Sequence, residues 1–448
     1  METKNEEIDQ HYKQFYDNIH NYIKVSNIAC KFIDSKPFQR LRSLHQLGTC
    51  HYVFPTAIHT RFEHSIGTYY LTGRLLNNIK NKINKDTLEE YLKNISELKE
   101  YYEKTNNYIL DNYICELIKI GGLCHDLGHG PFSHVFDDIF LQNNNSKMKT
   151  HEARSNMLLE HIINTTDLKD QITKSEIEFI KNIIKPKKTN KGFLYQIVSN
   201  SETGIDVDKF DYILRDTKTI GLLYSYDFSR LIDDIEIIDN CICYPKKLAY
   251  DLTYLYKTRF RLHKQVYRHK VTINTQTMIN NMMKYLDLII NFSSYIDDPN
   301  KFCKLTDNYI LSLVDILYER KESLTEQQIE NITNAYNLNE RLLTRDLYYF
   351  VDSINSKTKI LLDFDQLNIN HSNIEIYKST ITTGCPNSVL SNVWFFDKNN
   401  KNTKFKINKF DIGNINLQNE YILFIFMKEF NDRDYTIIKE HINKYKTF

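Results

Sequence analysis

Apolar residues recur at helical spacing along most of this chain. One such set, whose members fall on a single helix face, is Leu71, Leu75, Leu76 and Ile79. Only 12 glycines and 7 prolines occur among the 448 residues, so few positions interrupt a helix. The pattern predicts a mostly α protein with a helical core.

A second helix is predicted from Asn112 to Leu123. The apolar residues that share its buried face are Ile114, Leu117, Ile118 and Ile120. Glycines and a proline between positions 128 and 131 break the helical pattern after this run. The helix therefore carries His125 and Asp126 close to its end.

The pattern changes in two regions of the chain. Residues 77–111 are rich in Lys, Asn and Glu, which predicts a solvated helical insertion within a core domain of residues 1–300. Residues 301–448 predict a C-terminal lobe with helices and a small α+β part. In that lobe, 393–396 and 403–407 predict the two strands of a hairpin, and 421–427 predicts a buried strand.

Composition excludes several classes of protein. The 58 basic and 57 acidic side chains give a net charge of +1, so no overall field attracts nucleic acid or an anionic membrane. The eight cysteines show no CxxC spacing of a structural zinc site. The chain start lacks the regions of a signal peptide, and no segment approaches the ~20 apolar residues of a membrane span. We expect a soluble protein of the cytoplasm or nucleus.

Four residues combine the ligand types of a divalent metal site. They are His64, His125, Asp126 and Asp208. Two imidazoles and two carboxylates suit Fe, Mn or Zn, or Mg with more water ligands. A single histidine on an apolar helix is more often a core residue than a ligand. The pairing of His125 with Asp126 at a glycine-broken helix end favours the metal site.

Chemistry at phosphorus needs a polarised water, neutralised phosphate oxygens and a proton for the leaving oxygen. A bound metal supplies the first. The candidates for the proton are His129, His134 and His151, and the candidates for phosphate binding are Arg61, Lys209 and Arg259. Taken singly, each of these cations is equally consistent with an ordinary ion pair.

These residues stand in an ordered series of motifs. The series comprises FQRLR (38–42), QLG (46–48), YVFP (52–55), RFEHS (61–65), GLCHDLGHGPFSH (122–134), THE (150–152), GIDVDK (204–209) and YRHK (267–270). It resembles HD-domain phosphohydrolases, and among them the deoxynucleoside triphosphate (dNTP) triphosphohydrolases of animals, bacteria and viruses. The likeness is strong over roughly residues 10–285. About ten residues precede the first matching segment, so we expect no SAM-type module before the HD core.

The resemblance implies a helical HD core that converts a dNTP to a deoxynucleoside and triphosphate, with Mg on the nucleotide. It implies metal ligands at His64, His125, Asp126 and Asp208. It implies that His134 donates the proton, that His129 and His151 lie at the α-phosphate, and that Asp137 orients a histidine. It further implies phosphate contacts from Arg61, Lys209, Tyr212 and Arg259, and sugar contacts from Gln46, Leu47, Asp216 and Tyr267.

Elementary chemistry agrees with the sugar contacts. Gln and Asp side chains hydrogen-bond a 3′-hydroxyl, and a tyrosine ring against C2′ leaves no room for a 2′-hydroxyl. Without its neighbours, however, Tyr267 would be interpreted as one core aromatic among 31 tyrosines.

The resemblance also implies a homo-oligomer, a dimer or tetramer, activated by GTP and dNTPs. The matching activator positions are Lys13, Asp34, Gln39, Arg42, Arg230 and Lys247. Three residues depart from the family pattern: Tyr16 replaces an Asn, Pro245 replaces an activator-binding Arg, and Arg268 replaces a Gln. Arg268 either alters base contacts or pairs with an acidic residue on the surface.

Three functions are therefore weighed. The first is a metal-dependent dNTP triphosphohydrolase. The second is an HD-type phosphodiesterase or nucleotidase acting on another phosphate ester, which would leave Tyr267 and Asp216 without a role. The third is a nucleotide-binding or nucleic-acid-binding HD protein without turnover, against which the near-neutral charge and the complete ligand set argue.

Overall fold

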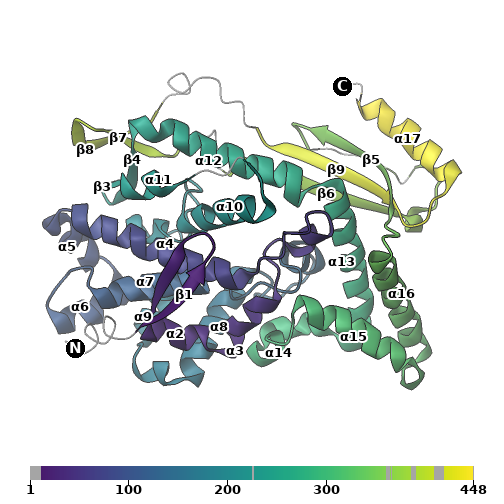
Figure 1. The fold of residues 1–448 in the computed structure, drawn as a ribbon, viewed down its shortest axis with the longest axis horizontal. Coiled ribbons are helices and arrows are strands. Elements are labelled where there is room, and N and C mark those ends of the chain that lie inside the picture. Colours follow the sequence, from purple (N-terminus) through teal and green to yellow (C-terminus); the bar gives the residue numbers. More distant parts are fainter. Residues whose placement is uncertain are drawn as a thin grey trace.

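Helices make up the body of the protein, and three small sheets complete it (Figure 1). The structure is a computed structural model that describes residues 12–223, 227–359, 364, 366–384, 390–407 and 418–446. The mostly α fold class is confirmed. The N-terminal residues, on which the expected lack of a secretion signal rests, lie outside the described residues.

The helices are α2 (Asn27–Ile33), α3 (Lys36–Gln39), α4 (Arg61–Lys82), α5 (Lys85–Lys93), α6 (Lys99–Thr105), α7 (Asn112–Cys124), α8 (His151–Thr165), α9 (Lys174–Ile184), α10 (Val207–Ile220), α11 (Ser229–Asp233), α12 (Ala249–Leu262), α13 (Lys270–Ile290), α14 (Pro299–Phe302), α15 (Asp307–Glu319), α16 (Glu326–Leu343) and α17 (Asp432–Lys446). Within the described ranges, no helix combines the length and apolar character needed to cross a membrane.

The strands form three sheets. Strands β1 (Tyr12–Asp17) and β2 (Asn21–Ser26) make an antiparallel hairpin. Strands β3 (Glu236–Ile238), β4 (Cys241–Pro245), β7 (Trp394–Asp397) and β8 (Asn400–Phe405) form a sheet in that order. Strands β5 (Tyr349–Ser356), β9 (Glu420–Met427) and β6 (Ile374–Ile381) form an antiparallel sheet in that order.

Helices α4, α7 and α10 pack together and carry the predicted metal ligands. The side chains of Thr60, Asp111 and Asp206 cap the starts of these three helices. Since α4 and α10 begin close to where α7 ends, His64, Asp208 and the His125–Asp126 pair come from three helix termini. The predicted helix over 112–123 is confirmed.

The insertion predicted over 77–111 is helical, but it is not merely solvated. Its apolar side chains join the main hydrophobic core: Leu88, Tyr91, Leu92, Ile95, Leu98, Tyr101 and Tyr102. The sequence reading missed this burial because these residues are spaced widely among Lys, Asn and Glu. The polar residues form one face of short amphipathic helices whose other face contacts the core.

Both β predictions in the C-terminal lobe are confirmed, as β7 with β8 and as β9. Strand β9 is apolar and buried from Ile422 to Met427 because both of its faces are covered there. Ile422, Phe424 and Phe426 join the main core, whereas the alternate residues pack under α17. The hairpin pairs with β4 through a parallel contact of β7, which the sequence reading did not anticipate.

The seven cysteines that the structure places are free thiols. The eighth, Cys385, lies outside the described residues.

Burial of the insertion predicts unequal effects for two neighbouring substitutions. Leu98→Ala removes a fully buried side chain and should lower the free energy of unfolding by roughly 2–5 kcal/mol. Lys99→Ala alters an exposed side chain and should change it by less than about 0.5 kcal/mol. Urea titration followed by circular dichroism measures both free energies. If both substitutions change the free energy of unfolding by similarly small amounts, the insertion is solvated and does not pack against the core.

Candidate metal and phosphate site

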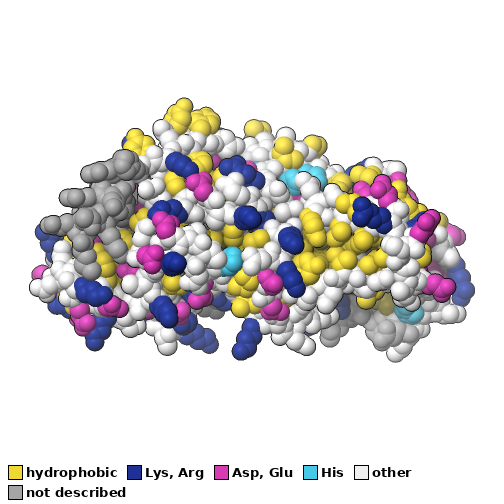
Figure 2. Space-filling view, turned by 90° about the horizontal axis from the view of Figure 1, so that it is seen from below, with side chains coloured by type: hydrophobic (Ala, Val, Ile, Leu, Met, Phe, Trp, Pro, Cys, Tyr) yellow, Lys and Arg dark blue, Asp and Glu magenta, His cyan; other side chains and the backbone are white. Residues whose placement is uncertain are grey.

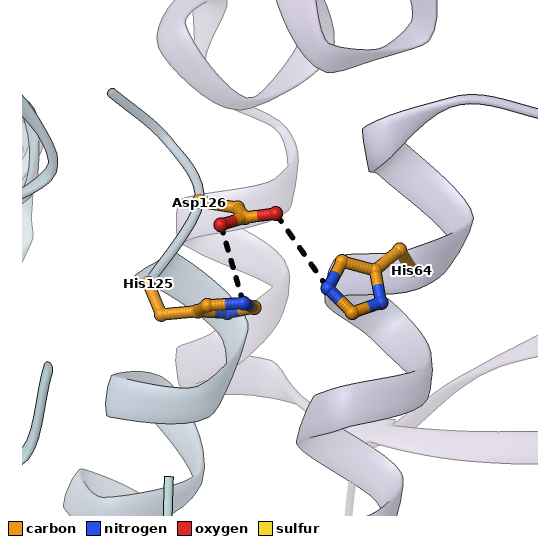
Figure 3. Close-up of side chains that lie close together, drawn as sticks. All are labelled: His64, His125 and Asp126. Carbon is orange, nitrogen blue, oxygen red and sulfur yellow. Dashed lines mark ion pairs between the residues drawn. The ribbon is translucent and has the colours of Figure 1, made fainter. Parts of the chain in front are cut away.

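The predicted metal ligands converge around the Asp126 carboxylate (Figure 3). Its oxygens lie 3.5 Å from His64 Nε2 and 3.3 Å from His125 Nε2. Asp208 Oδ1 approaches the same two nitrogens, at 3.2 Å from His64 and 3.5 Å from His125. The four predicted ligands thus share one small volume.

Hydrogen bonds hold both imidazoles in the orientation that a metal requires. His64 Nδ1 lies 2.7 Å from Asp211 Oδ2, and His125 Nδ1 lies 2.8 Å from the carbonyl oxygen of Gly122. In the neutral form that ligates a metal, Nδ1 of each ring therefore carries the proton and Nε2 presents a lone pair. Both Nε2 atoms are buried and have no hydrogen-bond partner among the residues that the structure describes. This donor set fits a divalent cation.

The charges at this cluster also favour a cation. Burial by itself lowers the pKa of the His64 imidazole, but the carboxylates of Asp208 and Asp211 raise it to about 10. Burial raises the pKa of Asp126, and the charges of His125 and Arg61 hold it well below its usual range. The cluster thus holds carboxylates that stay ionised and need positive charge beside them.

A cavity of about 370 Å³ opens beside the cluster and falls within the usual range for a small-molecule site. Thirteen of the sixteen residues proposed for metal, catalysis and substrate line it: Gln46, Leu47, Arg61, Asp126, His129, His134, His151, Asp208, Lys209, Tyr212, Asp216, Arg259 and Tyr267. The other three, His64, His125 and Asp137, contact these lining residues from behind. The structure brings the set together, while the role of each residue stays a prediction.

His129 and His151 stack, with ring centroids 4.1 Å apart. Asp137 Oδ2 lies 2.5 Å from His129 Nδ1, so His129 is the histidine that Asp137 orients, and buried Arg154 pairs with the other oxygen of Asp137. Burial and the nearby His129 hold the pKa of His151 well below its ordinary value. Gly128 allows this stacking, because a Cβ there would lie 2.0 Å from the His151 carbonyl oxygen.

His134 stands at the open side of the cavity. The two residues before it, Phe132 and Ser133, have φ of 56° and 55°, a left-handed conformation that costs free energy for residues with a side chain. A single π-helical turn over Val135–Phe140 follows it, a feature common at functional sites. His134 Nδ1 lies 3.1 Å from Asp138 Oδ2, which leaves Nε2 for the cavity.

Tyr267, Asp216 and His59 form a connected group at another wall. The Tyr267 hydroxyl donates to Asp216 Oδ2, and His59 Nε2 lies 2.7 Å from Asp216 Oδ1. Gln46 lines the same cavity, and its buried Oε1 has no hydrogen-bond partner in the described part of the chain. A buried amide oxygen without a partner is unfavourable unless a ligand donates to it.

Cationic side chains line the wall near Tyr212. Arg259 Nε donates to the Tyr212 hydroxyl at 3.2 Å, and Lys209 Nζ lies 2.9 Å from Asp206 Oδ2. Burial together with the neighbouring charges of Arg259 and Arg268 lowers the pKa of His263 well below its ordinary value. The positive potential there fits an anionic ligand.

The C-terminal lobe contributes to the cavity, which the sequence reading missed. Tyr377 of β6 lines it, and Arg259 Nη1 donates to the Thr382 carbonyl oxygen at 3.0 Å. Arg268 also lines it, donates to Ser379 Oγ and contacts His263 Nδ1 at 2.6 Å. Within the described ranges Arg268 forms no ion pair with a carboxylate, so the surface pairing considered for it is not observed.

The six proposed activator residues fall into two separate groups. In the first, Lys13 pairs with Asp34, Arg42 donates to Gln39 at 2.9 Å, and Gln39 donates to the carbonyl of Ile33 at 2.8 Å. In the second, Lys247 Nζ lies 2.8 Å from Asp234 Oδ2. Arg230 lies on α11, and Asp234 follows the last residue of that helix. Activator binding by either group stays a prediction.

Three further residues contact proposed site residues and were not predicted from the sequence: Asp138, Asp211 and His59. A fourth, His20, contacts Asp211. The spacing of His134 and Asp138, four residues apart, is a helical signal that could have identified the first. Asp211 lies three residues after Asp208, on the same face of a helix, so helical spacing could also have identified it. No local pattern connects His59 with Asp216 or His20 with Asp211, because these pairs are 157 and 191 residues apart.

Comparison with known proteins shows that the chain is similar to HD domain proteins. A sequence model of the HD domain matches residues 61–215. The chain is 38% identical to an HD domain-containing protein of Acanthamoeba polyphaga mimivirus, over 88% of this chain and 87% of the viral one. It is 37% identical to the SAMHD1 homolog of Dictyostelium discoideum, named a deoxynucleoside triphosphate triphosphohydrolase, over 75% of this chain and 60% of that protein. For human SAMHD1, which has the same enzyme name, identity is 36% over 70% of this chain and 52% of the human protein. The chain thus spans between half and two thirds of the length of these two enzymes.

The orphaned imidazole nitrogens predict a metal requirement that can be measured without substrate. The wild-type protein should bind Mn²⁺, and at 100 times Kd the metal should add about 2.7 kcal/mol to the free energy of unfolding. His64→Ala should weaken binding by about 100-fold or more, since it removes a ligand rather than an outer-shell partner. Titration calorimetry and metal analysis measure this, with His371→Ala, an exposed histidine of the C-terminal lobe, as the control. Equal Mn²⁺ affinity in both variants would refute the assignment of His64.

Proposed function

This chain belongs to the HD domain family, and on that premise we propose that it is a metal-dependent triphosphohydrolase that converts a dNTP to a deoxynucleoside and triphosphate. One observation carries the proposal: the cluster of predicted metal ligands, the cationic wall and the Tyr267–Asp216 pair all lie at the same cavity. The names of the Dictyostelium and human relatives support the same reaction. The metal is one of Fe, Mn, Zn or Mg, and Mg accompanies the nucleotide.

Water attacks the α-phosphorus, and the bond from phosphorus to the 5′ oxygen breaks. A bound metal supplies polarisation of that water and neutralisation of the α-phosphate. Arg61 is held at the α-phosphate end by Asp126 and by Ser133, to whose Oγ it donates at 2.9 Å. Lys209 and Arg259 add positive charge for the remaining phosphate oxygens.

The leaving 5′ oxygen takes its proton from His134. Asp138 lies against Nδ1 of this imidazole, so the proton to be donated is on Nε2. His129, oriented by Asp137, and His151 lie beside His134, with the rings of His129 and His134 5.4 Å apart, and contact the α-phosphate. With the proton transferred, the products are a neutral deoxynucleoside and triphosphate.

The sugar is recognised by the group around Asp216. The 3′-hydroxyl donates to the Asp216 carboxylate and accepts from the amide N–H of Gln46. The Tyr267 ring, held by its hydroxyl against Asp216, stands against C2′ and excludes a ribose. Leu47 completes this wall. Arg268 lies on the cavity wall and contacts the substrate rather than a surface carboxylate.

We extend the proposal to regulation and location. A dimer or tetramer activated by GTP or dNTPs would use the groups around Lys13 and Lys247, and the protein would act in the cytoplasm or nucleus. Nonspecific nucleic-acid binding is disfavoured, since Lys and Arg lie scattered among Asp and Glu on the face drawn in Figure 2 rather than in a basic stripe.

Product analysis tests the reaction itself. Protein loaded with Fe²⁺, Mn²⁺ or Mg²⁺ and given each dNTP, with and without GTP, should release intact triphosphate, which ion-exchange chromatography separates from phosphate and pyrophosphate. His134→Ala should lower kcat by roughly 10²- to 10⁴-fold while Mn²⁺ affinity stays within twofold of wild type. Release of monophosphate alone, or an unaltered kcat in this variant, would contradict the mechanism.

Two substitutions of Tyr267 separate this function from that of a general phosphodiesterase. Tyr267→Ala removes the ring and should lower the ratio of kcat/KM for dATP over ATP by about 10-fold or more, equivalent to 1.4 kcal/mol. Tyr267→Phe retains the ring and should keep most of the discrimination, losing only the bond to Asp216. If neither variant changes the ratio, the ring does not select the sugar, and another phosphate ester becomes the better substrate.

A further inference from the structure

We propose that the turn of the N-terminal hairpin, Asp17 to His20, is a positioning element for the metal ligand His64 and acts on it through Asp211. The inference rests on the metal site of the proposed function, but it concerns residues that none of the assigned roles includes. Both Asp17 and His20 come from the first twenty residues, far in sequence from the HD motifs.

Asp211 sets the orientation of the His64 ring. Its Oδ2 lies 2.7 Å from His64 Nδ1, and both side chains are fully buried. Asp211 lies one helical turn after Asp208 on α10, so one helix presents a predicted ligand and the carboxylate that orients another ligand. A partner on Nδ1 fixes both the tautomer and the ring plane of a ligating histidine.

The hairpin turn and Arg215 hold the other side of this carboxylate. His20 Nε2 lies 2.7 Å from Asp211 Oδ1. Arg215 donates to Oδ2 from Nε at 2.8 Å and to Oδ1 from Nη2 at 3.0 Å. With both oxygens engaged, the carboxylate of Asp211 cannot rotate without breaking a buried charge-assisted hydrogen bond.

The same arginine ties the turn to α10. Arg215 Nη1 donates to Asp17 Oδ2 at 2.8 Å, and Asp17 Oδ1 accepts from the backbone N–H groups of Ile19 and His20, each at 2.8 Å. Lys218 Nζ donates to the carbonyl oxygen of Asn18 at 2.7 Å. The shape of the turn and the place of the His20 ring are therefore set together by Asp17.

The packing leaves this network no alternative position. Gly67 follows His64 by one turn on α4, and a Cβ there would lie 2.0 Å from Asp211 Oδ1 and 2.6 Å from Arg215 Nη2. A glycine is required where the network approaches the helix that carries His64. Movement of the turn therefore changes the environment of Asp211 directly, and through it the direction of His64 Nε2.

Metal binding, measured without substrate, tests the inference. His20→Ala should weaken Mn²⁺ binding by about 10- to 100-fold, the usual effect of losing an outer-shell partner, and should alter the visible absorption of the Co²⁺-loaded protein. Asp211→Asn should alter that spectrum as well. Lys218→Ala is the matched control, because it releases the same turn without touching Asp211, and its Mn²⁺ affinity should stay within twofold of wild type.

A purely structural role predicts a different result. It would lower the Tm of the metal-free protein in His20→Ala and Lys218→Ala alike and leave the Co²⁺ spectrum of the folded fraction unchanged. That result, or wild-type Mn²⁺ affinity in His20→Ala, would overturn the inference. If His20→Ala fails to fold, His20→Gln, which retains a hydrogen-bond donor, replaces it. A Mn²⁺ affinity between those of wild type and Asp211→Asn supports the positioning role. A Mn²⁺ affinity no better than that of Asp211→Asn opposes it. Failure of the wild-type protein to bind either metal would instead refute the metal site of the proposed function.

Discussion

Burial of carboxylates at the meeting point of α4, α7 and α10 is the constraint on which the rest of the structure depends. An ionised carboxylate is strongly disfavoured away from water unless a cation and hydrogen-bond donors stand beside it. Here three buried arginines pair with buried aspartates: Arg61 with Asp126, Arg154 with Asp137, and Arg215 with Asp211 and also with Asp17. Of these aspartates, Asp126, Asp137 and Asp211 are the ones that face the site. Each of these aspartates in turn contacts an imidazole of the site. The packing of the helices and the orientation of the histidines are thus set by the same charges.

The C-terminal lobe belongs to the site as much as the HD helices do. Strand β6 contributes Tyr377 to the cavity wall, and the residues after it accept from Arg259. One face of β9 joins the main core while its other face packs under α17. A single core therefore spans both parts, and the cavity wall combines residues from Gln46 to Tyr377.

Much of this architecture follows from local pattern. The helix before His125, the hairpin near Trp394 and the apolar strand before Met427 are each determined by neighbouring residues, since periodicity and turn residues act over short distances. The same holds for the ligand types, because HD-type motifs place a histidine and an aspartate at adjacent positions. Burial of the insertion around Leu98 was missed, since a few apolar residues among many charges do not reveal which face meets the core.

The sequence by itself determined the kinds of side chain present: imidazoles and carboxylates suited to a metal, and cations suited to phosphate. The assignment of Tyr267 and Asp216 to a sugar came from the family resemblance. Only the tertiary structure decided which atoms face one another. It joined His20 to Asp211 and His59 to Asp216 across 191 and 157 residues, and among the described residues it gave the Nε2 of His64 no hydrogen-bond partner. Such contacts depend on how helices pack, and helix packing depends on volume and charge summed over many residues rather than on any local spacing.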